Sequence, residues 1–261
     1  MKRLLTLFLV GLLVLVGCAG GPTTPPPVTA APQDTNDDEA TPPEDAPETA
    51  SSAGADEAAE LLQSQPPNPG DMIAVMETTM GTIRFRLFPE LAPLAVENFV
   101  GLTEEGYYDG RNFHRVINDF MIQTGALNPD GAGATSFFRD ENDNPQPFAD
   151  EFTTELWHFR GAVSMANPGI PDSNLSQFFI VQAPGLAGGV ADQLRAVGYP
   201  EYVVDKYTAH GGTPHLDWRH TIFGHVIEGM EVVDAIAGVQ TGMQDRPVEE
   251  VLIVSMTIER A

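Results

Sequence analysis

The sequence predicts a mainly β protein, an antiparallel barrel of eight strands that closes on itself and is capped by two helices. Two observations predict this class. Short runs rich in apolar and β-branched residues recur along the chain, and two stretches among them have helical periodicity. Many short strands with few helices favour a closed barrel. The expected strands are 73–78, 81–87, 112–117, 120–124, 161–166, 177–182, 221–227 and 251–258.

The elements follow from local signals. Strands 73–78 and 81–87 form a hairpin, because apolar and polar positions alternate in the second arm and Gly81 supplies the turn. Pro93 opens the first helix, which Gly106 ends. The second helix covers 230–237, and the last strand completes the sheet.

The N-terminus reads as an export signal. Lys2 and Arg3 precede the apolar run 4–16, which is too short to span a bilayer as a mature helix. We therefore expect residues 1–17 to be a signal peptide.

Cys18 is the candidate lipid attachment site. It follows Leu15-Val16-Gly17, and this pattern resembles the bacterial lipoprotein box, in which the cysteine is acylated and becomes the new N-terminus. The protein would then be anchored to a membrane of the cell envelope, with its domain outside the cytoplasm. The alternative is an ordinary signal peptide cut near Ala19. Cys18 is the only cysteine, so a disulfide within one molecule is excluded.

Residues 18–70 are expected to form a disordered tether. From residue 19 onward this stretch holds eleven prolines, ten acidic residues and no lysine or arginine. Such a composition has too little apolar surface to offset the entropy of ordering. A flexible coil of this length would span about 40 Å. A solvated linker is the simpler reading, and a cation-binding or partner-binding acidic tail is the alternative.

Residues 71–261 are expected to form one domain, and their charge excludes some partners. This part carries 27 acidic and 11 basic side chains. No basic stripe is available to neutralise phosphates, so nucleic acid is not an expected partner. The surface is that of an exported protein that does not lie on anionic lipid, and we expect a monomer.

Five sequence blocks combine an arginine, amides and large apolar side chains from separate strands. The blocks are Phe113-His114-Arg115, Phe120-Met121-x-Gln123, Ser164-Met165-Ala166-Asn167, Ser176-Gln177-Phe178-Phe179-Ile180 and Leu216-Asp217-x-Arg219-His220-Thr221-Ile222-Phe223-Gly224. In this order they resemble the cyclophilins, the peptidyl-prolyl cis-trans isomerases, over nearly all of residues 72–260. The resemblance implies the eight-stranded cyclophilin barrel, isomerase activity on proline-containing peptides and no cofactor.

Arg115 is the residue that we expect to be catalytic. Rotation about an X-Pro bond is slow because amide resonance gives a barrier of about 18–20 kcal/mol, and the prolyl nitrogen becomes basic as the bond twists. A guanidinium can donate hydrogen bonds to the twisted group and stays protonated. The alternative for Arg115 is a surface ion pair.

The resemblance assigns the other site residues to peptide binding. The proline pocket would consist of Phe120, Met121, Phe179, Leu216 and His220. Gln123, Asn167 and Gln177 would hold the peptide backbone through their amides, and Ala166 through its own backbone. Read alone, phenylalanine and methionine at alternating strand positions are far more often part of a core, and only the co-occurrence of the blocks favours a pocket. The alternative for Asn167 and Gln177 is hydrogen bonding to nearby loops.

Two departures from the family pattern stand out. His215 occupies a pocket position where many cyclophilins have tryptophan, which puts binding of cyclosporin-type inhibitors in doubt. Residues 183–212 are an insertion that predicts two short helices, 190–197 and 201–207. The insertion could fold over one end of the groove and select substrates, or it could be a packed cap.

The recurrence of histidine at positions 210, 215, 220 and 225 does not predict a metal site. A five-residue spacing places neighbouring side chains on opposite faces of a strand, so they do not converge.

Three functional classes remain. The leading one is an exported, membrane-tethered isomerase that helps unfolded exported proteins fold. The second is a chaperone module that binds proline peptides with incidental turnover, and the third is a structural envelope protein that keeps only the barrel. Arg115 favours turnover, because a structural barrel has no use for it.

Overall fold

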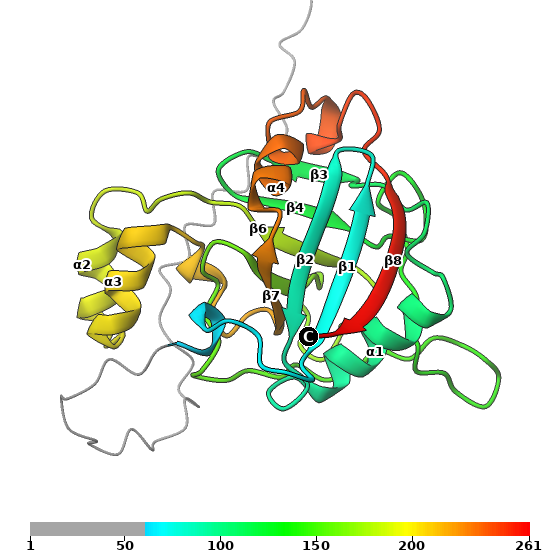
Figure 1. Cartoon of the computed structure of the whole chain (residues 1–261), viewed down its shortest axis with the longest axis horizontal. Coiled ribbons are helices and arrows are strands. Elements are labelled where there is room, and N and C mark those ends of the chain that lie inside the picture. Colours follow the sequence, from blue (N-terminus) through cyan, green and yellow to red (C-terminus); the bar gives the residue numbers. More distant parts are fainter. Residues whose placement is uncertain (1–60) are drawn as a thin grey trace, which may run out of the picture. The chain divides into compact units, whose positions relative to one another are not determined.

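The computed structural model describes residues 61–261, and the expected signal peptide, Cys18 and most of the tether lie outside this part (Figure 1). Eight strands form one antiparallel sheet in the order β3-β4-β6-β5-β7-β2-β1-β8. The strands are β1 (Met72–Thr78), β2 (Gly81–Leu87), β3 (Arg115–Ile117), β4 (Met121–Thr124), β5 (Ala162–Met165), β6 (Phe178–Val181), β7 (Ile222–Glu228) and β8 (Ile253–Arg260). The mainly β class and the eight antiparallel strands are confirmed.

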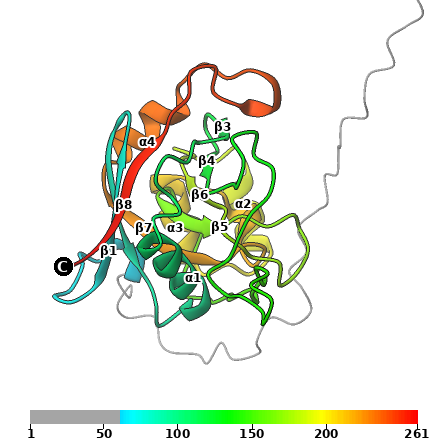
Figure 2. The ribbon, with the colours of Figure 1, turned by 90° about the vertical axis from the view of Figure 1, so that its right-hand side faces the viewer.

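The sheet curls until its two edge segments meet (Figure 2). Asn112, just before β3, forms an isolated bridge with Leu252, just before β8. The backbone N–H of Phe113 donates to the carbonyl oxygen of Val251 at 3.0 Å. The expected closure of the barrel is therefore made by a short junction outside the strands and not by a continuous ladder between β3 and β8.

Two helices pack against the sheet, as expected. In α1 (Pro93–Glu104), proline occupies the first turn, where its missing N–H is tolerated. The carboxylate of Glu151 accepts hydrogen bonds from the N–H groups of Leu94 and Ala95 at 3.0 and 2.9 Å, and so caps the helix from a distant loop. The second helix is α4 (Met230–Ala237).

The core lies where α1 meets the sheet. Phe99 of α1 is fully buried, and its ring lies 5.2 to 5.6 Å from four other aromatic rings. These rings belong to Phe85, Tyr108, Phe178 and Phe223. Because Phe178 precedes Phe179 on β6, this packing fixes the strand that carries part of the predicted site.

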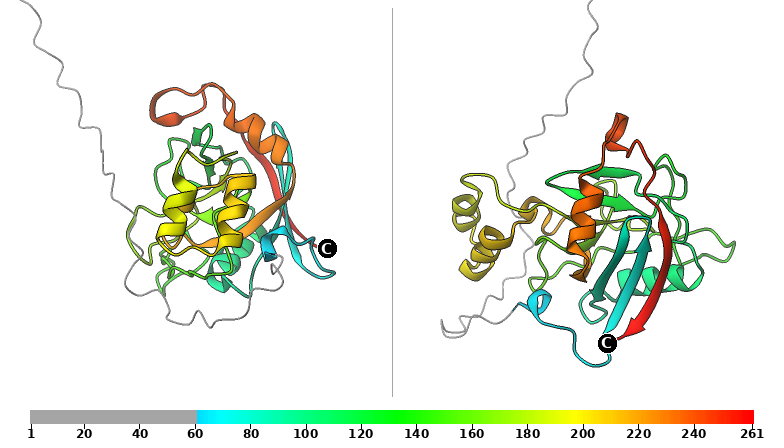
Figure 3. Two further views of the ribbon diagram at one scale, coloured as in Figure 1. Left: turned by 90° about the vertical axis from the view of Figure 1, so that its left-hand side faces the viewer. Right: turned by 45° about the horizontal axis from the view of Figure 1, so that its top comes forward.

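The insertion forms α2 (Val190–Ala196) and α3 (Glu201–His210), which lie side by side on one flank of the barrel (Figure 3). The two expected helices are confirmed. Leu194, Val203, Val204 and Tyr207 bury their apolar side chains against Trp157 and Phe159 in a core of their own. This second core keeps the insertion packed without help from the main one.

Residues 61–70, which were assigned to the expected tether, contact the folded domain. Gln63 is buried within a short 3₁₀ turn, Leu62–Ser64, and its amide both donates to and accepts from the backbone of Trp157, at 2.9 and 2.8 Å. The N–H of Gly70 donates to the carbonyl oxygen of Ala261 at 3.0 Å. Residues 61–70 thus belong to the domain. Their proline-rich composition is typical of a linker and gave no sign that the side chain of Gln63 binds the domain. Within residues 61–261, no helix is long and apolar enough to cross a membrane.

Candidate active site

A cavity of about 510 Å³ lies over the end of the sheet formed by β3, β4 and β6. Its lining contains every residue predicted for catalysis or peptide binding except His215. The lining residues are His114, Arg115, Phe120, Met121, Gln123, Asp130, Gly131, Ala166, Asn167, Gln177, Phe179, Leu216, His220, Gln244 and Arg246. The roles of these residues in turnover stay predictions, but the sequence blocks do meet at one place.

Strand register brings the central side chains together. Arg115 on β3 is paired with Gln123 on β4, and Gln123 is paired with Phe179 on β6. Directly opposed residues of antiparallel strands project from the same face of a sheet. A guanidinium, an amide and an aromatic ring therefore form one row across three strands.

Arg115 remains accessible in this row. Its side chain is 44% exposed, and its Nε lies 3.6 Å from the carboxylate of Asp245, which is 48% exposed. The surface ion pair considered as an alternative is therefore present. A pair this exposed contributes little, and Asp245 sits between the lining residues Gln244 and Arg246. The ion pair and a role at the cavity are compatible.

The amides are partly committed to neighbouring loops. Gln123 donates to the side-chain oxygen of Gln177 at 3.0 Å, and Gln177 in turn donates to the carbonyl oxygen of Gly133 at 3.0 Å. Asn167 donates to the carbonyl oxygen of Arg219 at 3.3 Å. The N–H of Ala166 donates to the backbone carbonyl oxygen of Gln177. A backbone contact from Ala166 to a peptide would therefore use the carbonyl oxygen of Ala166. The loop-bonding alternative thus holds for Asn167 and Gln177 alongside their place in the cavity.

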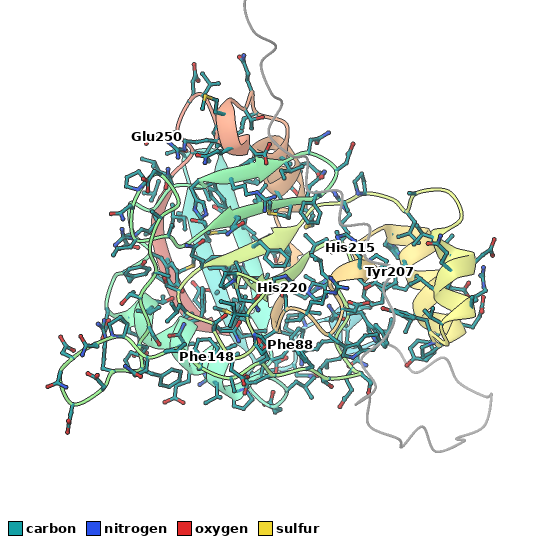
Figure 4. The ribbon with its side chains drawn as sticks, turned by 180° about the vertical axis from the view of Figure 1, so that it is seen from behind. Phe88, Phe148, Tyr207, His215, His220 and Glu250 are labelled. Atoms are coloured by element: carbon teal, nitrogen blue, oxygen red, sulfur yellow. The ribbon has the colours of Figure 1, made fainter. Side chains whose placement is uncertain are left out.

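Apolar side chains form a wall beside this row. Met121 and Phe179 are almost fully buried, and the rings of Phe179 and His220 meet edge to face with centroids 5.4 Å apart. His215 is not among the lining residues, and its ring stacks on that of Phe120 with centroids 5.7 Å apart, so its expected contact with the peptide stays a prediction. The positions of His215 and His220 are marked in Figure 4.

The cavity histidines are held neutral by their surroundings. Burial, and then the charge interaction with His158, lower the pKa of His220 from 6.5 to about 4. Burial, then the charges of Arg115 and Arg246, lower the pKa of His114 from 6.5 to about 4. At neutral pH the positive charge of the cavity therefore resides on its arginines.

Sequence reasoning missed five lining residues. His114 could have been found, because it sits inside the Phe113-His114-Arg115 block. Asp130 and Gly131 come from a loop that folds back so closely that a Cβ on Gly131 would lie 2.7 Å from the His114 ring. Gln244 and Arg246 come from a loop without any motif, and Arg246 donates to the carbonyl oxygen of Asp130 at 2.9 Å.

No residue of the insertion 183–212 is among the lining residues of this cavity. A larger hollow of about 990 Å³ lies elsewhere and contains none of the predicted site residues. It is lined in part by His210 and His225, while His220 lines the cavity. The recurring histidines are thus divided between different places.

Comparisons with known proteins agree with this geometry. The model of the cyclophilin-type peptidyl-prolyl cis-trans isomerase family matches residues 73–258. A Staphylococcus epidermidis protein assigned as a peptidyl-prolyl cis-trans isomerase is 46% identical over 185 residues, which cover 71% of this chain and 90% of that protein. A Staphylococcus aureus protein with the same assignment is 45% identical over 190 residues, covering 73% and 93%.

Solved structures give the same result. A cyclophilin-type peptidyl-prolyl cis-trans isomerase of Cryptosporidium parvum, crystallised in the presence of the dipeptide Ala-Pro, matches with a TM-score of 0.57 at 27% identity. The match covers 72% of this chain and 99% of that one. With the family model matching most of the chain and the row of Arg115, Gln123 and Phe179 in place, the chain belongs to the cyclophilin-type peptidyl-prolyl cis-trans isomerases.

Proposed function

We propose that this isomerase works outside the cytoplasm, held to a membrane by an acyl chain on Cys18, and accelerates X-Pro rotation in exported proteins as they fold. The observation that carries the catalytic part is the accessible guanidinium of Arg115 beside an apolar wall. The export signal and the cysteine at the end of its apolar run support the location.

The chemistry needs binding and hydrogen bonding only. The apolar wall of Phe120, Met121 and Phe179 takes the proline ring, and Arg115 donates to the group that becomes electron-rich as the bond twists. A catalyst must bind the twisted bond better than either planar form. No nucleophile, proton relay or cofactor is required for this rotation.

The second candidate is a chaperone module that holds proline peptides with incidental turnover. The same apolar wall would serve it. The accessible arginine favours catalysis, because holding a proline ring does not require a charged donor beside it. The two functions differ in one measurable quantity, the exchange rate of bound peptide.

The anchor is tested with Cys18→Ser. Full-length protein expressed in a lipoprotein-processing bacterium is expected to partition into detergent and to carry acyl mass on a mature N-terminal Cys18. The Cys18→Ser variant is expected to remain unprocessed or to be released. Mass spectrometry that finds a mature N-terminus beyond Cys18 in wild type would overturn the anchor and leave the isomerase activity untouched.

The neutral histidines predict the pH dependence of turnover. Because the pKa values of His114 and His220 are lowered from 6.5 to about 4, both rings stay neutral as the pH falls through 6.5. We expect kcat/KM to be flat from about pH 8 to about pH 5.5 and to fall below that, as positive charge gathers near Arg115. Circular dichroism at each pH separates this loss from unfolding. An inflection near 6.5 would show that these rings titrate as exposed histidines do.

A further inference from the structure

A buried chain of hydrogen bonds joins the insertion to the segment behind the proline pocket. One carboxylate oxygen of Asp217, Oδ2, accepts from the hydroxyl groups of Tyr207 at 2.8 Å and Tyr199 at 3.1 Å. The other, Oδ1, accepts from the backbone N–H of His158 at 2.9 Å and lies 2.8 Å from its ring Nδ1. The side chain of Asp217 is 2% exposed. A single buried carboxylate thus makes four polar contacts, two to His158 and two to tyrosines of the insertion.

His158 carries this connection to the pocket. Its ring is fully buried, lies parallel to the ring of Phe179 with centroids 6.1 Å apart, and meets the ring of His220 edge to face at 6.5 Å. Phe179 and His220 both line the cavity, whereas His158 does not. In a close-packed interior, the position of the His158 ring therefore limits where these two pocket rings can lie.

The backbone between Leu216 and His220 is held by the same residues. Trp218 has a left-handed backbone, with φ of 56°, and a bulky residue keeps this conformation only where its surroundings enforce it. The ring of Trp218 packs on Trp157 at 5.3 Å and on Tyr199 at 5.4 Å. Tyr199 therefore supports the pocket segment through its ring as well as through its hydroxyl group.

The order Asp217, His158 and Ser164 is that of an acid, base and nucleophile, but it does not form a hydrolytic site. His158 Nε2 lies 3.0 Å from Ser164 Oγ, and both residues are fully buried. The hydroxyl group of Ser164 also lies within hydrogen-bond distance, 3.0 Å, of the carbonyl oxygen of Thr221. No substrate bond can reach Ser164 Oγ, so a structural role for the chain of hydrogen bonds remains.

We propose that Asp217 and His158 are positioning residues for the isomerase, and that Tyr199 and Tyr207 fix them, so that the insertion sets the shape of the proline pocket from behind without touching the peptide. The proposal rests on the isomerase activity. It accounts for the insertion lying outside the cavity and still bonding to the residue next to Leu216. Small displacements of groups that bind a transition state are costly, so the main effect falls on turnover.

The test is the double variant Tyr199→Phe/Tyr207→Phe in the full-length protein, which removes two hydroxyl groups and keeps both rings. For a short proline peptide, well below the melting temperature, we expect kcat to fall about tenfold and KM to change less than about twofold. Tyr202→Phe is the matched control on the same helix as Tyr207, because Tyr202 is 42% exposed, and it should leave both constants unchanged. Asp217→Asn should lower kcat in the same direction as the double variant.

A double variant that is folded by circular dichroism and keeps kcat within about twofold of wild type would overturn the proposal. If the double variant does not fold, the single variants Tyr199→Phe and Asp217→Asn decide by the same criterion, each keeping the size of its side chain. A wild-type protein without turnover would instead contradict the isomerase assignment, so the two failures are distinguishable.

Discussion

Replacing Arg115 with alanine is expected to lower kcat/KM for X-Pro isomerisation by about 10²- to 10³-fold, the usual cost of losing one donor to a developing charge. The fold should be unchanged, because the side chain is 44% exposed and its one ion pair, to Asp245, is weak. Peptide isomerisation measured by NMR exchange or a coupled assay gives the rates. Arg115→Lys should be intermediate, since it keeps the charge but loses the planar array of donors.

Arg139→Ala is the control for a general loss of positive charge, because Arg139 is exposed and does not line the cavity. Its rate should equal that of wild type. A folded Arg115→Ala protein whose kcat/KM stays within about threefold of wild type would contradict the donor role of the guanidinium. The rate enhancement would then come from the apolar wall and the amides alone.

Truncating Phe99 to alanine is expected to lower the free energy of unfolding by about 3–5 kcal/mol. The ring is fully buried at the centre of four other aromatic rings, so the change removes buried area and leaves a cavity. Urea and thermal unfolding measure the loss. For a domain of this size the melting temperature should fall by about 10 °C.

Phe152→Ala is the matched control, because Phe152 is 45% exposed. Its free energy of unfolding should stay within about 1 kcal/mol of wild type. Equal losses for the two variants would mean that the α1 interface does not hold the sheet together, and that β6 with Phe179 is positioned by other contacts.

The eight strands and the lining residues that lie in the five sequence blocks could be predicted because each has a local signal. Alternation and turn residues mark the strands, and the order of the five blocks places Arg115, Gln123 and Phe179 in register. Closure of the barrel has no such signal. It depends on a short junction of backbone contacts around Asn112 and Leu252, and contacts of this kind leave no pattern in the sequence.

The remaining differences come from long-range contacts of single side chains. Gln63 lies in a proline-rich stretch typical of a linker, yet its amide bonds to Trp157 across 94 residues. Tyr207 has a helical position that predicts burial but not a bond to Asp217. The stacking of His215 on Phe120 likewise depends on the paths of two segments. Sequence patterns report the environment of a residue better than its partner.

The most direct test is NMR exchange on a short Ala-Pro peptide with substoichiometric wild-type protein. The account predicts that the cis and trans resonances of the peptide exchange far faster than without the protein, where exchange takes tens to hundreds of seconds. It also predicts shifts of the amide signals around Arg115, Gln123 and Phe179. Both effects should be retained without added metal or nucleotide. Peptide binding that shifts those signals while cis/trans exchange stays at the uncatalysed rate would contradict the account and identify the domain as a proline-binding module.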